Sequence, residues 1–437
     1  MRQSLILIIS LITVSFGFSQ ENTNNFSLQQ AIDYALENNR QVKNAARDID
    51  AAIKQKWETI ATGLPQLNAA VDYQNAIKRN VAVFGGETFP IGAEQSLTAT
   101  ATLSQLLFDG SYIVGLQSAK VFLEISENAK LKTDLEVRKV VVNAYGNVLL
   151  AEESIKILDR NIAVLERNLD ETTKIYENGL EEEESVEQLQ ITLSGVQSSL
   201  NNATRLKDLA YQMLNITMGL DINDNIELVD SLESLTSQNL LSDLINADDN
   251  IENNIDFKIA ANDTESKELL LKLEKSKALP TLNAFVNGGY AANRESFNFT
   301  NSSEPWFGSS ILGLSMNIPI FSSGMRSAST QRAAINLEKA KDDLTETEQQ
   351  LKFQIASSKS DYQFSIEDYQ NKKENLGLAE RIETKNQTKF FEGIASSFEL
   401  RQAQTQLYAA QQEFLQAMLD VINSKAALET VLNTPIN

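Results

Sequence analysis

The chain consists of one unit that occurs twice in tandem, and this duplication constrains its fold more than any other feature. The segment Leu-Pro-Gln-Leu-Asn-Ala at 64–69 returns as Leu-Pro-Thr-Leu-Asn-Ala at 279–284, a shift of 215 residues. The segment Tyr-Glu-Asn-Gly-Leu at 176–180 returns as Phe-Phe-Glu-Gly-Ile at 390–394, a shift of 214. A nearly constant shift across most of a chain indicates a duplicated architecture. Each copy is predicted to contain a helix, two short strands, a very long helix and a further helix.

The composition argues against an enzyme. The 437 residues include no Cys and no His, and the formal charge is −21. Without Cys there are no disulfides or thiolate metal sites, and without His the commonest general base is missing. Strong acidity argues against a nucleic-acid partner, whose binding depends on Lys and Arg. We therefore predict no catalytic site, no metal site and no cofactor.

The first 20 residues have the pattern of an export signal. Arg2 supplies the positive start, an apolar run extends from Leu5 to Val14, and small or polar residues at 17–20 suit cleavage. The apolar run is shorter than the roughly 20 residues of a membrane-spanning helix. The rest of the sequence has no long apolar helix. We expect an exported protein without a helical membrane anchor.

Four stretches alternate between apolar residues and small or polar residues. The apolar positions are Leu67, Ala69, Val71 and Tyr73; Leu97, Ala99, Ala101 and Leu103; Leu282, Ala284 and Val286; and Leu312, Leu314, Met316 and Ile318. Runs of about 10 residues with this period suit transmembrane β-strands, and they equally suit a soluble hairpin with one wet face. The segments at 84–90 and 293–307, rich in Gly, Asn, Ser and aromatic residues, are predicted to be hairpin tips near a membrane interface.

The remaining sequence is helical. Residues 115–178 contain no Pro and only Gly146 in the interior, which predicts a helix of roughly 95 Å at about 1.5 Å per residue. Apolar residues recur with the 3-4 spacing of coiled-coil seams at Ile155, Leu158, Ile162, Leu165, Leu169, Thr172 and Tyr176; Val186, Leu189, Leu193, Val196, Leu200 and Ala203; and Leu400, Ala403, Leu407, Ala410, Phe414, Ala417, Val421, Ser424 and Leu428. Gly179 and Gly393 are predicted to end the long helices. Capping boxes are predicted at Ser185–Gln188 and Ser396–Glu399.

These signals divide the chain into four parts. They are a signal peptide at 1–20, a first repeat at 21–219, a linker at 220–240 and a second repeat at 241–437. Each repeat begins with a helix, followed in the first repeat by a hairpin at 65–108 and helices at 111–178 and 185–218. The second repeat has its hairpin at 280–321 and helices at 325–391 and 397–432.

Four strands are too few to close a barrel. Open sheet edges are not viable in lipid, because unpaired backbone N–H and C=O groups find no water there. Several copies must therefore pool their strands if the strands span a membrane. Two copies give 8 strands and a filled lumen, whereas three give 12 strands and an open channel. The helices would then form a hollow coiled-coil cylinder assembled from all copies.

The order and duplication of these motifs resemble the TolC-like outer membrane efflux protein family, the outer membrane factors. The motifs are the Leu-Pro-x-Leu strand entries, the strand-to-helix exits at 108–110 and 318–324, and the Tyr/Phe-x-x-Gly-Leu/Ile helix tips. The resemblance implies a mainly α homotrimer. Each chain would contribute four strands to a 12-stranded transmembrane β-barrel in outer-membrane lipid, with long antiparallel helices forming a periplasmic tunnel.

In function, the resemblance implies a passive exit duct that works with a periplasmic adaptor and an inner-membrane pump. The duct would serve tripartite efflux or type I secretion, and small molecules, metal ions and proteins all remain open as cargo. The alternative from the residues alone is a soluble exported coiled-coil scaffold or surface-binding protein without a barrel.

The resemblance also assigns roles to the helix tips. Gly179, Leu180, Gly393 and Ile394 would dock the adaptor, although both glycines are also expected as simple helix C-caps. Aligned on Gly393, the positions that ring the constricted periplasmic mouth are Glu399 and Gln402, and only the first is acidic. Three Glu399 carboxylates would attract cations; the other interpretation is a capping residue for Ser396. The acidic run Glu181, Glu182, Glu183 and Glu184 would line the mouth or form a solvated face.

Overall fold

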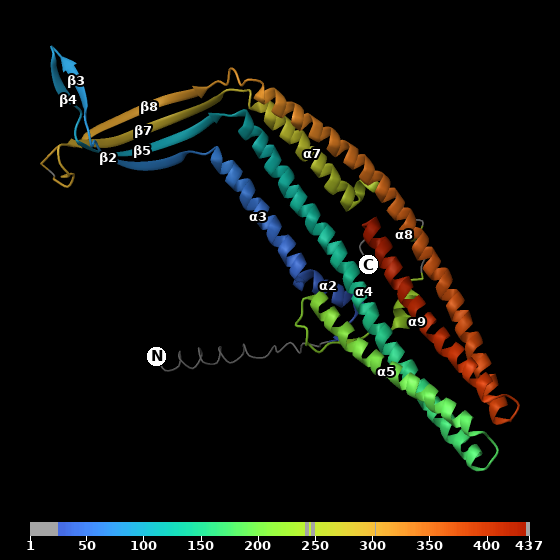
Figure 1. Cartoon of the computed structure of the whole chain (residues 1–437). Coiled ribbons are helices and arrows are strands. Elements are labelled where there is room, and N and C mark those ends of the chain that lie inside the picture. Colours follow the sequence, from blue (N-terminus) through green and yellow to red (C-terminus); the bar gives the residue numbers. More distant parts are fainter. Residues whose placement is uncertain (1–24, 241–243, 246–249, 302, 434–437) are drawn as a thin grey trace, which may run out of the picture. The chain divides into compact units, whose positions relative to one another are not determined.

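The order of helix, strands, long helix and helix occurs twice in the computed structural model, which describes residues 25–240, 244–245, 250–301 and 303–433. The predicted signal peptide lies outside these residues. The first repeat contains β1 (Asn25–Phe26), α2 (Leu28–Asn38), α3 (Arg40–Thr62), β2 (Gln66–Asn75), β3 (Asn80–Phe84), β4 (Glu87–Ile91), β5 (Gln95–Phe108), α4 (Gly110–Glu177) and α5 (Glu183–Met218). Then follow β6 (Glu227–Leu228), α6 (Leu232–Gln238), a 3-10 turn (Ile251–Asn253), α7 (Ile255–Ser276), β7 (Thr281–Arg294), β8 (Phe307–Asn317), α8 (Met325–Phe391) and α9 (Ser397–Leu432) (Figure 1). The predicted mainly α fold, with two tandem repeats, long antiparallel helices and four long strands, is confirmed.

The chain divides into two compact units. The sheet unit comprises the described residues of 44–132 and 250–353, and the tip unit comprises the described residues of 1–43, 133–249 and 354–437. The sheet unit holds the four long strands, and the tip unit holds the ends of the two helical hairpins α4–α5 and α8–α9.

The first predicted hairpin is more complex than expected. β2 and β5 do pair, but a separate hairpin, β3–β4, projects from the sheet between them (Figure 1). The supposed loop at 84–90 is therefore mostly strand. Gly85 and Gly86, with φ of +63° and +87°, supply the tight turn, because two left-handed residues match the twist of a two-residue hairpin. In the second repeat β8 ends at Asn317, and Pro319, which lacks an N–H, follows in a loop rather than a strand.

The first helix of the first repeat is also interrupted. Asn39 leaves the helical conformation between α2 and α3, with φ of −57° and ψ of 135°. Its Oδ1 accepts a 2.7 Å hydrogen bond from the N–H of Gln41, and its Nδ2 donates to the carbonyl of Thr217 at 2.7 Å. Asn39 thus caps the new helix α3 and fastens it to the end of α5.

The four long strands form one antiparallel sheet in the order β2-β5-β7-β8. The register aligns Leu67 with Leu103, Leu103 with Val286, and Val286 with Leu312. Residues paired in this way share a face of the sheet, and successive residues alternate between the faces. The apolar stretches recognised in the sequence therefore fall on one common face, which we call the apolar face.

A buried tyrosine secures the start of the described chain in the tip unit. The Tyr145 side chain is fully buried, and its hydroxyl lies 2.9 Å from both the Phe26 carbonyl and the Asp230 carboxylate. Asp230 also accepts a 2.7 Å hydrogen bond from the N–H of Leu28, at the start of α2. Burial, and then the bond to Asp230, raise the pKa of Tyr145. The network joins α4, the N-terminal strand β1 and the linker, since β1 pairs in parallel with β6.

We expect Tyr145→Phe to destabilise the tip unit by about 1–2 kcal/mol, because removing the hydroxyl leaves the Asp230 carboxylate short of a partner. Hydrogen exchange should become faster in β1 and β6, and the thermal transition should shift downward. Tyr34→Phe, which changes a tyrosine outside this network, is the control. Equal exchange rates in the two variants would show that the hydroxyl contributes nothing.

Candidate functional site: the sheet faces, the sheet edges and the helix tips

The apolar face of the sheet is exposed in the single chain. Leu67, Val71, Leu312 and Leu314 have 72%, 70%, 78% and 70% of their surfaces accessible. A contiguous exposed apolar surface of this kind is rare on soluble monomers and marks an interaction surface. On strands of 10–14 residues with period 2, it has the character of a lipid-facing surface.

The opposite face of the same sheet is rich in hydroxyl and amide groups. Its residues include Asn68, Asp72, Gln74, Thr98, Thr100, Thr102, Asn283, Asn287, Ser309 and Ser315. Asp72 carries the only charge on this face of the four long strands, all of which the structure describes. Phe285, Phe307 and Ile311 are large apolar exceptions on this face. The ring of Phe285 covers Gly313, where an added Cβ would lie only 2.5 Å from the ring. We call this surface the polar face.

Among the residues that the structure describes, both edges of the sheet are open. β2 and β8 are the first and last strands in the order, so each has only one strand beside it. In lipid such edges must find a partner strand. The sheet runs β2 and β7 in one direction and β5 and β8 in the other. These directions would let a β8 edge pair with the β2 edge of another copy in antiparallel orientation, the pairing that the rest of the sheet uses.

The two helix tips share one geometry, and both predicted C-cap glycines are confirmed. Gly179 and Gly393 have φ of +76° and +73°. The N–H groups of Leu180 and Ile394 each donate to the carbonyl five residues earlier, at 3.1 and 2.8 Å. This is the Schellman arrangement, in which the residue after the glycine commonly packs back on the helix. Here both residues are instead exposed, Leu180 at 79% and Ile394 at 70%.

The predicted capping box at α9 is also confirmed. The N–H of Glu399 donates to Ser396 Oγ at 3.3 Å, and Glu399 Oε2 accepts from the N–H of Ser396 at 2.8 Å and from its hydroxyl at 3.1 Å. Hydrogen bonds from the Ser396 backbone, and then from its side chain, lower the pKa of Glu399. Gln402 is exposed one turn further along the same helix. The structure therefore shows Glu399 as a cap, and its role at a mouth stays a prediction.

The predicted capping box at Ser185–Gln188 is wrong. α5 begins at Glu183, two residues earlier than Ser185, and its N-cap Glu182 makes no side-chain cap bond. Ser185 is buried inside the first turn and donates its hydroxyl to Glu181 at 2.7 Å. Glu183 and Glu184 occupy the first turn, where negative charge is favoured by the helix dipole. The acidic run thus extends the helix toward its N-terminus.

A buried polar layer crosses the helical seams of the tip unit, and sequence reasoning missed it. Gln387 donates to Asn168 at 2.9 Å, joining α8 to α4, and Asn161 donates to Gln411 at 2.8 Å, joining α4 to α9. Glu383 is only 8% exposed, and burial raises its pKa. The seven-residue spacing of Asn161 and Asn168 could have predicted this layer. It places both side chains at the same position of the heptad, and polar residues at a seam position commonly set the helix register.

Two further features are absent from the described residues. No cluster of three or more Asp or Glu side chains there has the arrangement of a metal site. None of the helices in that part of the chain is both long and apolar enough to cross a membrane.

A sheet with an apolar face, a polar face and two open edges is typical of channels whose wall is shared between chains. Comparison with known proteins identifies the class more closely. The family model described as "Outer membrane efflux protein" matches residues 31–220 and 247–434, and the chain belongs to this family.

Similar proteins cover nearly the whole chain. Outer membrane protein TolC of Salmonella enteritidis is 23% identical over 446 aligned positions, covering 99% of this chain and 87% of that protein. Outer membrane protein TolC of Vibrio cholerae is 22% identical, with coverage of 99% and 96%. Among solved structures, the outer membrane protein VceC of Vibrio cholerae superposes with a TM-score of 0.73 at 16% identity, covering 93% of this chain and 95% of that one. The open-state MtrE outer membrane channel of Neisseria gonorrhoeae gives 0.72 at 17%, covering 93% and 88%.

These relatives place the protein in the outer membrane as the exit duct of an efflux system. They favour the duct over a soluble coiled-coil scaffold, and they agree with the exposed apolar face of the sheet.

Proposed function

We propose that three copies of this chain assemble into one duct, with β8 of each copy pairing with β2 of the next. The observation that carries the proposal is a sheet with one apolar face and two open edges. Three sheets of four strands make a 12-stranded barrel, wide enough for a channel, whereas two would make a small filled one. Antiparallel pairing at each junction leaves no edge unpaired in lipid.

In this assembly the polar face lines the lumen. Its hydroxyl and amide groups keep the lumen wet, and apart from Asp72 it carries no charge on the four long strands. A surface of this kind interacts weakly with many solutes and selects few of them. The duct is therefore passive, and the inner-membrane pump chooses the cargo.

The helix tips serve as the docking points for a periplasmic adaptor. Each chain presents two tips of the same geometry, at Gly179 and Gly393, so a trimer presents six. Leu180 and Ile394 offer one exposed apolar side chain per tip. Such a pseudo-sixfold surface suits a ring of six adaptor chains. In the same assembly Glu399 and Gln402 lie at the mouth, and Glu181, Glu182, Glu183 and Glu184 give its rim a negative charge.

Cross-linking between the edges tests the assembly directly. The chain has no Cys. If one cysteine is introduced on β2 and one on β8, every disulfide that forms must therefore involve these two positions. We expect oxidation of such pairs, scanned along the two strands, to yield covalent dimers and trimers. Pairs placed on β2 and β7, which no junction brings together, are the control.

The same preparation should behave as a detergent-stable trimer by mass and should conduct ions across planar bilayers. A monomer that carries no current, with disulfides only within single chains, would reject the duct.

A further inference from the structure

The loop that joins β7 to β8 folds over the apolar face of the sheet. Ala292 and Arg294 stand on that face by register, and both are buried, at 0% and 5% exposure. Asn293, between them on the polar face, is exposed. Gln95, paired with Arg294 on the apolar face, is also buried. The loop therefore covers the apolar face at this end of the sheet and leaves the polar face open.

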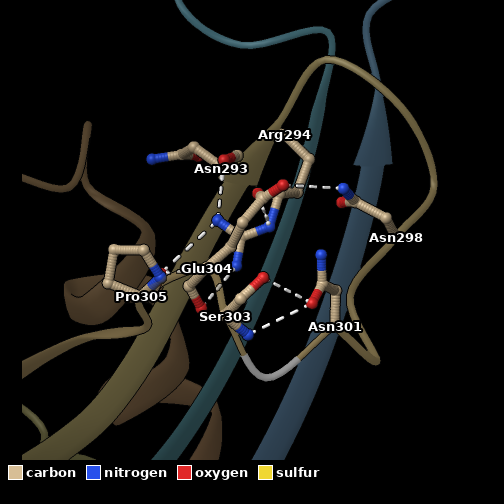
Figure 2. Close-up of polar contacts among 7 residues, drawn as sticks. All are labelled: Asn293, Arg294, Asn298, Asn301, Ser303, Glu304 and Pro305. Carbon is tan, nitrogen blue, oxygen red and sulfur yellow. Dashed lines mark hydrogen bonds and ion pairs between the residues drawn. The ribbon is translucent and has the colours of Figure 1, made fainter.

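A buried arginine holds the loop in this position (Figure 2). The guanidinium of Arg294 donates to the carbonyls of Asn293 and Glu304, each at 3.1 Å, and reaches the carbonyl of Pro305 at 3.4 Å. Its Nε lies 2.8 Å from Glu304 Oε2, an ionic contact rather than a well-directed hydrogen bond. The other oxygen of Glu304 accepts a 2.9 Å bond from Asn298. Both ends of the loop are thus fastened to one side chain.

The fastened loop presents a cluster of aromatic rings. Phe297 and Phe299 pack edge to face at 5.5 Å, and Tyr73 on β2 meets them at 5.6 and 6.0 Å. Trp306 adjoins Phe299 at 6.5 Å. Phe299 is buried at 8% exposure, whereas Phe297 remains 71% exposed and Trp306 37%. Phe299 is the buried centre of the cluster, and Phe297 and Trp306 keep part of their surfaces exposed.

We propose that this loop is a membrane anchor, in which Phe297 and Trp306 contact the interfacial layer of the outer leaflet. The inference rests on the proposed duct, since it requires the apolar face to meet lipid. Both rings continue that face at the end of the sheet furthest from α7 and α8 along the strands. Trp306, whose indole has a polar N–H, is of the type that concentrates at this depth of a bilayer, and aromatic residues in general flank the apolar band of transmembrane strands. The local charges are neutralised in pairs, Arg294 with Glu304 and Arg79 with Glu295, which lowers the cost of placing them there.

Tryptophan fluorescence tests the contact. The chain has two tryptophans, Trp57 and Trp306, so Trp57→Phe leaves Trp306 as the only reporter. The full-length trimer is reconstituted in phosphatidylcholine vesicles with bromine either near the headgroup or near the end of the acyl chain. We expect the shallow bromines to quench most of the emission, the deep bromines less, and aqueous iodide very little.

Variants of the two ion pairs test whether the contact between Arg294 and Glu304 holds Trp306 against lipid. Glu304→Gln in the Trp57→Phe background should release the loop, shift the emission to longer wavelength and replace quenching by lipid with quenching by iodide. Glu295→Gln breaks the neighbouring exposed ion pair with Arg79 and should leave both quenching profiles unchanged. Equal effects of the two variants would overturn the role of Arg294.

The outcomes separate this inference from the duct itself. Iodide quenching of Trp306 in trimers that conduct ions would overturn the anchor and leave the duct intact. Protection from both lipid and aqueous quenchers would mean that a second copy covers the loop, which also overturns it. Loss of trimer and current in the Trp57→Phe protein and in the wild type would reject the duct instead.

Discussion

Replacement of Leu180 and Ile394 by aspartate is expected to abolish export from cells while the trimer still forms and inserts. Both side chains are among the most exposed apolar groups of the tip unit, at 79% and 70%. Neither lies on a coiled-coil seam, so the substitution costs little folding free energy. A charge at the centre of a docked apolar contact, by contrast, must be desolvated without a partner, which costs several kcal/mol.

The measurement is export by cells that express each variant, together with cross-linking from the tip to a periplasmic adaptor. Leu180→Met and Ile394→Val keep the apolar character and serve as matched controls that should export normally. Trimer mass and single-channel current should be unchanged in all variants. Normal export and normal adaptor capture by both aspartate variants would place docking elsewhere and reduce the tips to helix caps.

Removal of the Glu399 carboxylate is expected to weaken block of the channel by polyvalent cations. The proposal predicts three such carboxylates around the mouth, and rings of like charge set ion preference. The difficulty is that Glu399 also caps α9. Glutamine satisfies the same capping position, and the chain itself uses Ser27 and Gln30 in this way at α2. Glu399→Gln therefore removes the charge and keeps the cap.

Ser396→Ala is the complementary variant, since it removes the capping hydroxyl and keeps the carboxylate. We expect it to lower thermal stability, by about 1 kcal/mol for the lost cap, and to leave cation block unchanged. Glu399→Gln should weaken cation block and lower stability only by the part of the cap that depends on the charge, and Glu399→Ala should weaken block and lose the whole Glu399 contribution to the cap. Unchanged block in Glu399→Gln, measured as current against polyvalent cation concentration, would leave Glu399 with the cap alone.

The pH dependence of these effects follows from the lowered pKa of Glu399. Because the pKa is lower in the folded chain than in the unfolded one, the carboxylate stabilises the fold above the unfolded value, and this stabilisation is lost as the pH falls through the folded value. Cation block should disappear over the same acidic range and persist at neutral pH. Glu399→Gln should show neither dependence.

Local sequence signals predicted the helical part of the structure well. The left-handed glycines after α4 and α8 and the capping box at Ser396 depend on residues within one turn of each other, so the sequence contains all the information they need. The error at Ser185 has a local cause too. Four consecutive acids favour an earlier helix start, and they outweighed a weaker serine signal.

The sheet was predictable in its strands and less so in its connections. Alternation along the four strands correctly predicted one apolar side for each strand, because the side-chain period of a strand is 2. The register then placed the four apolar sides on one face of the sheet. The β3–β4 hairpin was taken for a loop, since the glycine and aromatic residues of 84–90 resemble a hairpin tip. Its strands became evident only from the pairing of Val81 with Pro90 and Val83 with Thr88.

The sequence by itself determined that the chain is duplicated and has four long strands and long paired helices, because the duplication is visible in the residue order, and period and capping depend on residues close together in the chain. Only the tertiary structure decided which surface the 295–306 loop covers, how Asn161 and Asn168 join three helices, and that Tyr145 ties the linker to β1. Each of these depends on groups from separate segments of the chain. These contacts form only when distant segments come together, which costs chain entropy that local sequence patterns do not reveal.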